Sequence, residues 1–286
     1  MNEQVRELVE GADQVLVIGE LMTDLNTGAF TARLNPKRTV TIGHHQLQVN
    51  DGALLSVEMG DILTELARRL PKRKLTRIKP TSVAPFVGNG DDCISAEALY
   101  PRWARFIRPD DILIAESGTA SYGLLFALMP LGATFHSQTQ WGSIGWATPA
   151  AFGAAIAAPG RRVVLVTGEG AHQLTAQEIS QFGRLGLKPI VFLLNNNGYL
   201  IERMFCKEPG IAYNDIAQWR YAELPRVLGC DGWFTARVTT CGEFDAALER
   251  ALNANTGVYI EVVTDTYAAP ELMLKLHDAV KVLYKQ

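Results

Sequence analysis

The sequence has neither a strong excess of one charge nor a long apolar run, and each absence excludes a class of protein. Its 286 residues carry 27 Lys and Arg against 30 Asp and Glu, for a net charge of −3. Nothing in that balance favours nucleic acid or an anionic membrane surface as a partner. No apolar run approaches the roughly 18 residues of a membrane span. The first residues, MNEQVRELVEGAD, are acidic and amphipathic, unlike a signal peptide.

Cysteine is scarce as well. The four cysteines, Cys93, Cys206, Cys230 and Cys241, show neither close pairing nor the spacing of a metal site. We therefore expect reduced thiols in a cytoplasmic protein. Internal repeats and low-complexity tracts are also absent. The length suits one large domain or two smaller ones.

Two short apolar runs predict the centre of the fold. Val163 to Thr167 and Ile190 to Leu194 have the composition of strands buried on both faces of a parallel sheet. Between them, Thr175 and Glu178 have the spacing of a capping box and predict a helix to about Arg184. Strand, helix and strand would form a right-handed βαβ unit. The carboxyl ends of its strands share one edge of the sheet, where open α/β sheets bind ligands.

Small polar residues follow both predicted strands, Gly168-Glu169-Gly170 after the first and Asn195-Asn196-Asn197-Gly198 after the second. The Glu169 carboxylate, an amide oxygen of Asn195 or Asn196 and a free backbone carbonyl are hard ligands that suit Mg²⁺ or Ca²⁺ rather than zinc. Glycines let the backbone approach a phosphate, and the N-terminus of the next helix favours an anion. These residues indicate a magnesium–diphosphate site. An ordinary βαβ turn followed by an Asn-Gly turn is the alternative.

The rest of the chain divides into two predicted α/β units, residues 1–70 and 95–286, joined by a basic, proline-bearing linker over 71–94. In the first unit we expect a helix over 5–10, a buried strand over 14–18, a strand over 39–42, short strands to about residue 57, and a helix capped by Asp61.

In the second unit, Ser95 should cap a helix to about Ile107. Further strands are expected over 111–115, 134–136, 233–238 and 258–263. Helices are expected over 199–204, from 216 to about 228, over 244–253 and after Pro270. The alternation of strands and helices predicts a parallel sheet covered on both faces.

Several segments together resemble the thiamine-diphosphate-dependent 2-oxo acid decarboxylases of the pyruvate and indolepyruvate type. Gly-Glu-Gly, the 24 residues 171–194 and Asn-Asn resemble the signature of that family, which usually has Gly-Asp-Gly. The segments that extend the similarity are WGSIGWATPAAFGAA (141–155), QLTAQEIS (173–180), LKPIVFLLNN (187–196), GYLIER (198–203) and YNDIAQW (213–219). The resemblance covers about residues 90–270 strongly and 1–70 more weakly.

This resemblance implies a fold and an activity. The fold would be a Rossmann-like parallel sheet domain that binds the diphosphate, residues 95–286, preceded by part of a central α/β domain, residues 1–70. The activity would be non-oxidative decarboxylation of a 2-oxo acid, such as pyruvate, indolepyruvate or phenylpyruvate, to an aldehyde. Its cofactors would be thiamine diphosphate and Mg²⁺, and the protein would be a homo-oligomer.

The resemblance also implies site residues. Glu169, Asn196 and the Gly198 carbonyl would bind Mg²⁺. The residues expected around the cofactor are Ser117, Thr119, Gly142, Ile144, Gly168, Gly170, Ala171, Asn196, Gly198 and Ile201. Without the family, Ser117 and Thr119 would be helix-capping residues and Ile144 would be core. With it, Ile144 would be the apolar wedge that bends the cofactor, and the Gly142 carbonyl would accept from its aminopyrimidine.

Glu202 lies 33 positions after Glu169 and matches a family glutamate that contacts substrate. Partial burial beside apolar residues would suit it to proton transfer. The alternative is a surface glutamate paired with Arg203. His44 and His45 resemble a catalytic histidine pair of the family. That pair lies in another domain, however, and here we expect a solvated loop.

In the family, the glutamate that activates the cofactor lies in an amino-terminal pyrimidine-binding domain, for which these 286 residues show no counterpart. We therefore expect the cofactor-binding half of an enzyme, inactive without that domain as a separate chain or a full-length subunit. A non-catalytic cofactor-binding fragment or regulatory protein, and another thiamine-diphosphate carboligase or lyase, are the alternatives. A nicotinamide oxidoreductase is disfavoured, because no strand is followed by Gly-x-Gly-x-x-Gly with an acid about twenty residues on.

Overall fold

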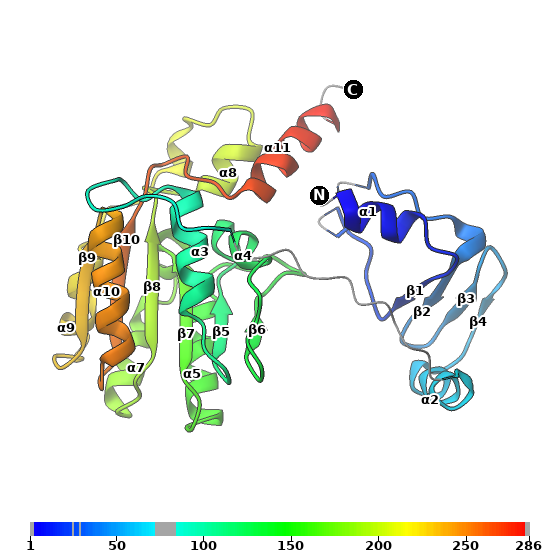
Figure 1. Cartoon of the computed structure of the whole chain (residues 1–286), viewed down its shortest axis with the longest axis horizontal. Coiled ribbons are helices and arrows are strands. Elements are labelled where there is room, and N and C mark those ends of the chain that lie inside the picture. The colour runs from blue at the N-terminus through cyan, green and yellow to red at the C-terminus, as the bar shows by residue number, and fades with distance from the viewer. Residues whose placement is uncertain (1–2, 25, 29, 72–83, 284–286) are drawn as a thin grey trace. The chain divides into compact units, whose positions relative to one another are not determined.

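The computed structural model describes residues 3–24, 26–28, 30–71 and 84–283, which form two compact units (Figure 1). One unit comprises Met1–Lys79 with Lys275–Gln286, and the other comprises Pro80–Leu274. Of the predicted linker over 71–94, residues 72–83 lie outside the described residues. Among the described residues, no helix combines the length and apolarity needed to cross a membrane.

The first unit is built on a small mixed sheet. Its elements are α1 (Glu3–Glu10), β1 (Val15–Ile18), η1 (Pro36–Arg38), β2 (Thr39–Ile42), β3 (Leu47–Val49), β4 (Leu54–Leu55) and α2 (Met59–Arg69). The strands follow one another in chain order, β1 and β2 parallel and the others antiparallel. Asp61 lies in the first turn of α2 and Glu58 is the N-cap, so the predicted cap was wrong by three residues. His44 and His45 are exposed after β2, as expected, and His45 pairs with Glu58.

Little of this first unit is buried. Among its described residues, Ile42 is the one apolar side chain that lies in the buried class. Strand β1 forms where it was predicted, but Leu16 is 46% exposed and Ile18 is 44% exposed. The prediction that this strand is buried was therefore wrong. An apolar run sets the extended conformation, but burial requires a layer of other residues over it.

The second unit contains the six-stranded parallel sheet that the sequence predicts. Its strands are β5 (Ile112–Ala115), β6 (Thr134–His136), β7 (Val163–Gly168), β8 (Ile190–Asn195), β9 (Phe234–Val238) and β10 (Val258–Val263). They lie in the order β6-β5-β7-β8-β10-β9, and every pairing is parallel. The Rossmann-like α/β class is thus confirmed.

Helices cover both faces of this sheet (Figure 1). On one face, residues of α3 (Ala96–Phe106) and α10 (Cys241–Asn253) share a core cluster with Val164 and Val166 of β7. On the other, residues of α5 (Ala147–Ala157), α7 (Ile179–Arg184) and α9 (Leu224–Val227) belong to a second cluster, with Val163 and Leu165. Successive β7 side chains enter opposite cores, because side chains alternate across a strand. This double burial explains the unbroken apolar run.

Three helix starts differ from the predictions. Thr175 forms no capping box; its hydroxyl donates to the Gly145 carbonyl at 2.9 Å, and a short turn (η2, Ala176–Glu178) precedes α7. Residues 216–220 are not helical; a turn (η4, Tyr221–Glu223) leads into α9, which begins at Leu224 and has Pro225 in its first turn. A capping box that was not predicted, Thr240 with Glu243, opens α10. Ser95 caps α3, and α11 (Glu271–Leu283) follows Pro270, both as expected.

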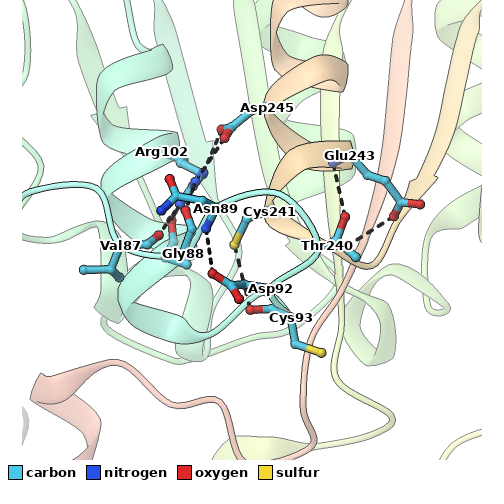
Figure 2. Close-up of polar contacts among 11 residues, drawn as sticks. Val87, Gly88, Asn89, Asp92, Cys93, Arg102, Thr240, Cys241, Glu243 and Asp245 are labelled. Carbon is cyan, nitrogen blue, oxygen red and sulfur yellow. Dashed lines mark hydrogen bonds and ion pairs between the residues drawn. The ribbon is translucent and has the colours of Figure 1, made fainter.

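Residues 84–93, which we call the strap, are hydrogen-bonded to the rest of the second unit mainly through Arg102 of α3 (Figure 2). This buried guanidinium donates to the carbonyls of Val87 (2.7 Å) and Gly88 (2.8 Å) and pairs with both carboxylate oxygens of Asp245 on α10. The N–H of Cys241 donates to the Asp92 carbonyl at 2.8 Å. The described end of the predicted linker is therefore hydrogen-bonded within the second unit, although most of its residues are exposed.

Candidate functional site

A pocket opens at the carboxyl edge of the sheet, where β5, β7 and β8 end. Short helices start at the same edge: α4 (Thr119–Leu124) after β5, α6 (Glu169–His172) after β7, and α8 (Leu200–Phe205) after β8. Parallel strands bring these three helix starts together, although they are far apart in the sequence. The edge is therefore where the predicted site has to be sought.

Ten of the twelve predicted site residues line this pocket. From the β5 and α5 sides come Ser117, Thr119 and Ile144. From the ends of β7 and β8 come Gly168, Glu169, Gly170, Ala171, Asn196, Gly198 and Ile201. Gly142 and Glu202 are described but lie outside the lining. All of these residues belong to the second unit.

Glu169 reaches from the end of β7 across to the end of β8. Its side chain is 1% exposed, and Oε1 accepts from the backbone N–H groups of Asn196 (3.1 Å) and Gly198 (2.8 Å). Burial raises the pKa of Glu169 to about 7, although these N–H groups and Arg203 act to lower it. A nearby cation would stabilise the ionised carboxylate against that loss of hydration.

The Asn196 side chain faces two oxygens. The end of its amide lies 2.8 Å from the Gly198 carbonyl oxygen and 3.2 Å from Glu169 Oε1. With its amide nitrogen at that end, Asn196 donates to both oxygens; with the amide turned over, its oxygen would join them as a third possible ligand of a cation. One carboxylate, one amide and one carbonyl are the oxygen ligands that Mg²⁺ or Ca²⁺ prefers. Of the two predicted candidates, Asn196 rather than Asn195 lines the pocket.

A left-handed turn at Asn197 creates this convergence. Asn197 has φ 63° and Gly198 has φ 133°, so the chain reverses immediately after β8. Arg203, buried on α8, donates to the Asn197 carbonyl at 2.8 Å and to Asp215 at 2.7 Å. The alternative in which Arg203 pairs with Glu202 is therefore wrong.

Two glycines at the pocket are required by close packing. A Cβ on Gly170 would lie 2.4 Å from the Tyr199 ring, and one on Gly198 would lie 2.3 Å from the Asn214 carbonyl oxygen. Neither backbone nor a packed ring yields easily to such a contact. The glycines therefore keep the backbone N–H groups at the start of α6 and α8 close to the pocket, where they can face an anion.

Glu116, directly after β5, was not predicted as a site residue. It is buried, and Oε2 accepts from the N–H groups of Gly145 (3.2 Å) and Ala147 (3.1 Å), while Oε1 accepts from Ser117. Burial raises the pKa of Glu116. Its contacts hold the loop that carries Ile144. A charged residue directly after a buried strand was the available signal.

The remaining predicted residues are placed as follows. Ile144 is 39% exposed at the pocket, so the alternative of a core residue is wrong. Gly118, which has no side chain, is the N-cap of α4, so Ser117 and Thr119 do not cap that helix. Gly142 lies in a left-handed turn with φ 60°. Glu202 is exposed on α8, and the partial burial expected for it is not found in this structure.

Comparison with known proteins identifies the domain around this pocket. Residues 118–262 match the family model described as "Thiamine pyrophosphate enzyme, C-terminal TPP binding domain". The matched stretch begins beside the β5 end of the pocket and finishes within β10. It therefore includes nearly all of the pocket lining and accounts for half of the chain.

Relatives and solved structures extend the similarity. Proteins named alpha-keto-acid decarboxylase from Mycobacterium ulcerans and Mycobacterium avium are 37% and 36% identical over 96% and 95% of this chain, covering 49% of each relative. The chain thus spans about half the length of the curated relatives it matches. A thiamine diphosphate-dependent 4-hydroxybenzoylformate decarboxylase of Rhodococcus jostii has a TM-score of 0.66 at 22% identity, covering 91% of this chain and 50% of that one. A benzoylformate decarboxylase of Polynucleobacter necessarius has a TM-score of 0.67 at 18% identity, covering 93% and 52%. The two structures support the fold.

Proposed function

This chain belongs to the thiamine pyrophosphate enzymes, through their C-terminal cofactor-binding domain, and on that premise we propose that it is the cofactor-binding half of a 2-oxo acid decarboxylase. It would bind thiamine diphosphate and Mg²⁺ and act on a substrate of the pyruvate, indolepyruvate or phenylpyruvate type. The observation that carries the proposal is the convergence of Glu169, Asn196 and the Gly198 carbonyl in one pocket. The family match sets aside the nicotinamide alternative, and a cytoplasmic location stays a prediction.

The donor set fits a magnesium ion bound to a diphosphate. With the Asn196 amide turned so that its oxygen faces the pocket, that oxygen, the Gly198 carbonyl and the Glu169 carboxylate would hold the cation, and the diphosphate and water would supply its other ligands. Backbone N–H groups at the start of α6 and α8 would take part of the anionic charge. Glu169 stands where the family usually has aspartate. In this structure Glu169 Oε1 accepts from the N–H groups of Asn196 and Gly198, directly after β8.

When bound, thiamine diphosphate supplies a carbanion and an electron sink for loss of CO₂. Ile144 would support the bent cofactor from the loop that Glu116 holds, and the Gly142 carbonyl would accept from its amino group. Glu202 would transfer protons beside the substrate. Its exposure in this structure means that another segment must cover it to provide the expected burial.

The rim of the pocket supports a need for such a segment. Ile144 shares its loop with Trp141, which is largely exposed, and the exposed Leu174 lies against that loop near Gly145. An apolar rim open to water around a charged site is typical of a surface that another domain covers. We propose that an amino-terminal pyrimidine-binding half, in the same or another subunit of a homo-oligomer, lies there. Excluding water would also strengthen the electrostatic interactions of the site.

Calorimetry on the 286-residue chain tests cofactor binding. We expect Mg²⁺-dependent binding of thiamine diphosphate, lost in Glu169→Ala and kept or tightened in Glu169→Asp, whose shorter side chain is the usual family ligand. Glu249→Gln, which removes an exposed carboxylate on α10, is the control and should bind normally. Equal binding by the parent and Glu169→Ala would contradict the metal assignment.

Activity is tested with a coupled assay using pyruvate, phenylpyruvate and indolepyruvate. The chain by itself should not decarboxylate them at a useful rate, whereas co-expression with the amino-terminal half of a related decarboxylase should restore turnover. In that assembly Glu202→Gln should lower turnover by about 10²–10⁴-fold, with little effect on cofactor affinity. A chain that binds the cofactor but stays inactive in every assembly would favour the non-catalytic alternative.

A further inference from the structure

Glu261 is a buried carboxylate that the proposed reaction does not use. We propose that it is a positioning residue, which orients Asn195 and so sets the turn that gathers the oxygens of the proposed metal site. The inference rests on the proposed function only where it concerns the metal. The positioning itself is a property of this chain and can be tested without any ligand.

The location of Glu261 is unusual for a charged side chain. It lies on β10, inside the sheet, and is 3% exposed. Its strand pairs with β8 so that Glu261 is opposite Leu193 and Val263 is opposite Asn195. The alternation of side chains places Glu261 and Asn195 on the same face of the sheet. A carboxylate buried this deeply needs hydrogen-bonding partners to offset the loss of water.

Asn195 supplies one such partner and is itself fixed by the contact. Its Nδ2 donates to Glu261 Oε1 at 2.8 Å, and its Oδ1 accepts from the backbone N–H of Asn197 at 3.2 Å. The backbone N–H of Asn197 can only donate, so the Asn195 amide must turn its oxygen to that group and its nitrogen to Glu261.

The bond from Asn195 to Asn197 decides the shape of the turn. An asparagine that accepts from the N–H two residues ahead forms an Asx-turn, which favours a sharp reversal. Here the reversal puts Asn197 in the left-handed region at φ 63°, where the Arg203 guanidinium also holds its carbonyl. The Asn196 amide and the Gly198 carbonyl meet only because of this reversal. Glu261 thus acts on the site through Asn195, without touching the ligands.

Arg237 on β9 provides a matched control. It is 55% exposed and lies 3.5 Å from the same Glu261 oxygen. If Glu261 mattered merely as one half of an ion pair, removing Arg237 would have the same consequence as removing Glu261. If Glu261 matters because it fixes Asn195, Arg237→Gln leaves the turn intact.

The first experiment measures backbone hydrogen exchange in metal-free protein. Glu261→Met replaces the carboxylate by an apolar side chain of similar length. We expect exchange at the Asn197 N–H to become about tenfold faster, as loss of one fixed hydrogen bond implies. Glu261→Gln should restore slow exchange, because its amide oxygen can still accept from Asn195, and Arg237→Gln should match the parent. Unchanged exchange in Glu261→Met overturns the proposal, whether or not the parent binds a metal.

The second experiment titrates Mn²⁺ in the presence of saturating thiamine diphosphate. Glu261→Met and Asn195→Ala should each weaken Mn²⁺ binding by about tenfold, as is typical when a group that orients metal ligands is lost. The double variant should lose no more than Asn195→Ala alone, because Glu261 acts through Asn195. Additive losses would overturn that route. No Mn²⁺ binding by the parent would refute the proposed metal site, while the exchange experiment would still decide on Glu261.

Discussion

Two strands of nearly identical composition show how differently the two units use an apolar run. β1 reads Val-Leu-Val-Ile and lies in the first unit, with Leu16 and Ile18 largely exposed. β7 begins Val-Val-Leu-Val and lies in the second unit, where all four side chains are buried. The apolar, β-branched composition of both segments favours an extended strand. What differs is the layers around them, since β7 has neighbours on both edges and helices on both faces.

The same contrast extends to polar groups. In the first unit the hydrogen bond between His45 and Glu58 is exposed to solvent. In the second unit Glu116, Glu169 and Glu261 are almost fully buried, each with defined hydrogen-bond donors. Buried charges are costly unless they are paired, so they occur where a site requires them.

The largest effect should come from deleting volume in β7. Leu165→Ala should lower the free energy of unfolding of the second unit by about 4 kcal/mol, because it leaves a cavity that the packed neighbours fill only partly. Tryptophan fluorescence during urea unfolding reports this unit specifically, since all five tryptophans lie between residues 103 and 233. Leu16→Ala, the matched change in β1, should leave that transition in place. A loss below about 1 kcal/mol for Leu165→Ala would contradict the comparison.

A smaller effect should appear on acidification. His172 is fully buried against Thr148, and burial lowers the pKa of this histidine to about 4. The unfolded chain, with an ordinary histidine pKa, takes up a proton first as the pH falls. The contribution of His172 to the free energy of unfolding is therefore fully present above about pH 6.5. It falls by about 3 kcal/mol as the pH decreases towards 4 and does not change further below that.

The measurement for His172 is the difference between two pH profiles of urea stability, parent and His172→Gln. Taking the difference removes the contribution of Glu169, whose pKa burial raises to about 7. His45→Gln, a change of the exposed histidine in the first unit, serves as the control and should follow the parent. Parallel profiles for the parent and His172→Gln would refute the expectation.

The next effect in decreasing size is expected at the strap (Figure 2). Arg102→Met should lower the free energy of unfolding of the second unit by about 2 kcal/mol, because the Val87, Gly88 and Ala98 carbonyls lose a charged hydrogen-bond donor. The cost is smaller than for a fully buried pair, since Asp245 regains water. Hydrogen exchange should become faster at Cys241 and Gly242, whose N–H groups donate to the strap. Unchanged exchange there would show that the strap is held independently of Arg102.

The smallest effect should come from the open face of β1. Ile18→Thr keeps a β-branched side chain in the strand and removes apolar surface that water already contacts. We expect a change below about 0.5 kcal/mol in the stability of the first unit, read from exchange of the β1 and β2 amides. A loss well above 1 kcal/mol would show that this face is covered in solution, and the contrast with β7 would fail.

Much of the second unit could be predicted because its signals are local. β-branched runs marked the strands, Ser95 marked the start of α3 and Pro270 that of α11. The predictions failed where a side chain had a distant partner. Thr175 had the spacing of a capping box, but its hydroxyl bonds to Gly145, thirty residues earlier in the chain. A local sequence pattern suggests a hydrogen-bond partner a few residues away, whereas the folded chain can bring a distant partner to the same polar side chain.

The sequence by itself determined the parallel α/β domain and the positions of Glu169, Asn196 and Gly198 around one pocket, because apolar strand runs and the spacing of a motif are local features of the chain. Only the tertiary structure decided which charged residues support that pocket. Glu116 and Glu261 resemble surface residues in the sequence, yet the first holds the loop 29 residues on and the second holds Asn195, 66 residues before it. Such contacts depend on how the strands are arranged side by side. That arrangement determines which charges are buried and which groups are near enough to satisfy them.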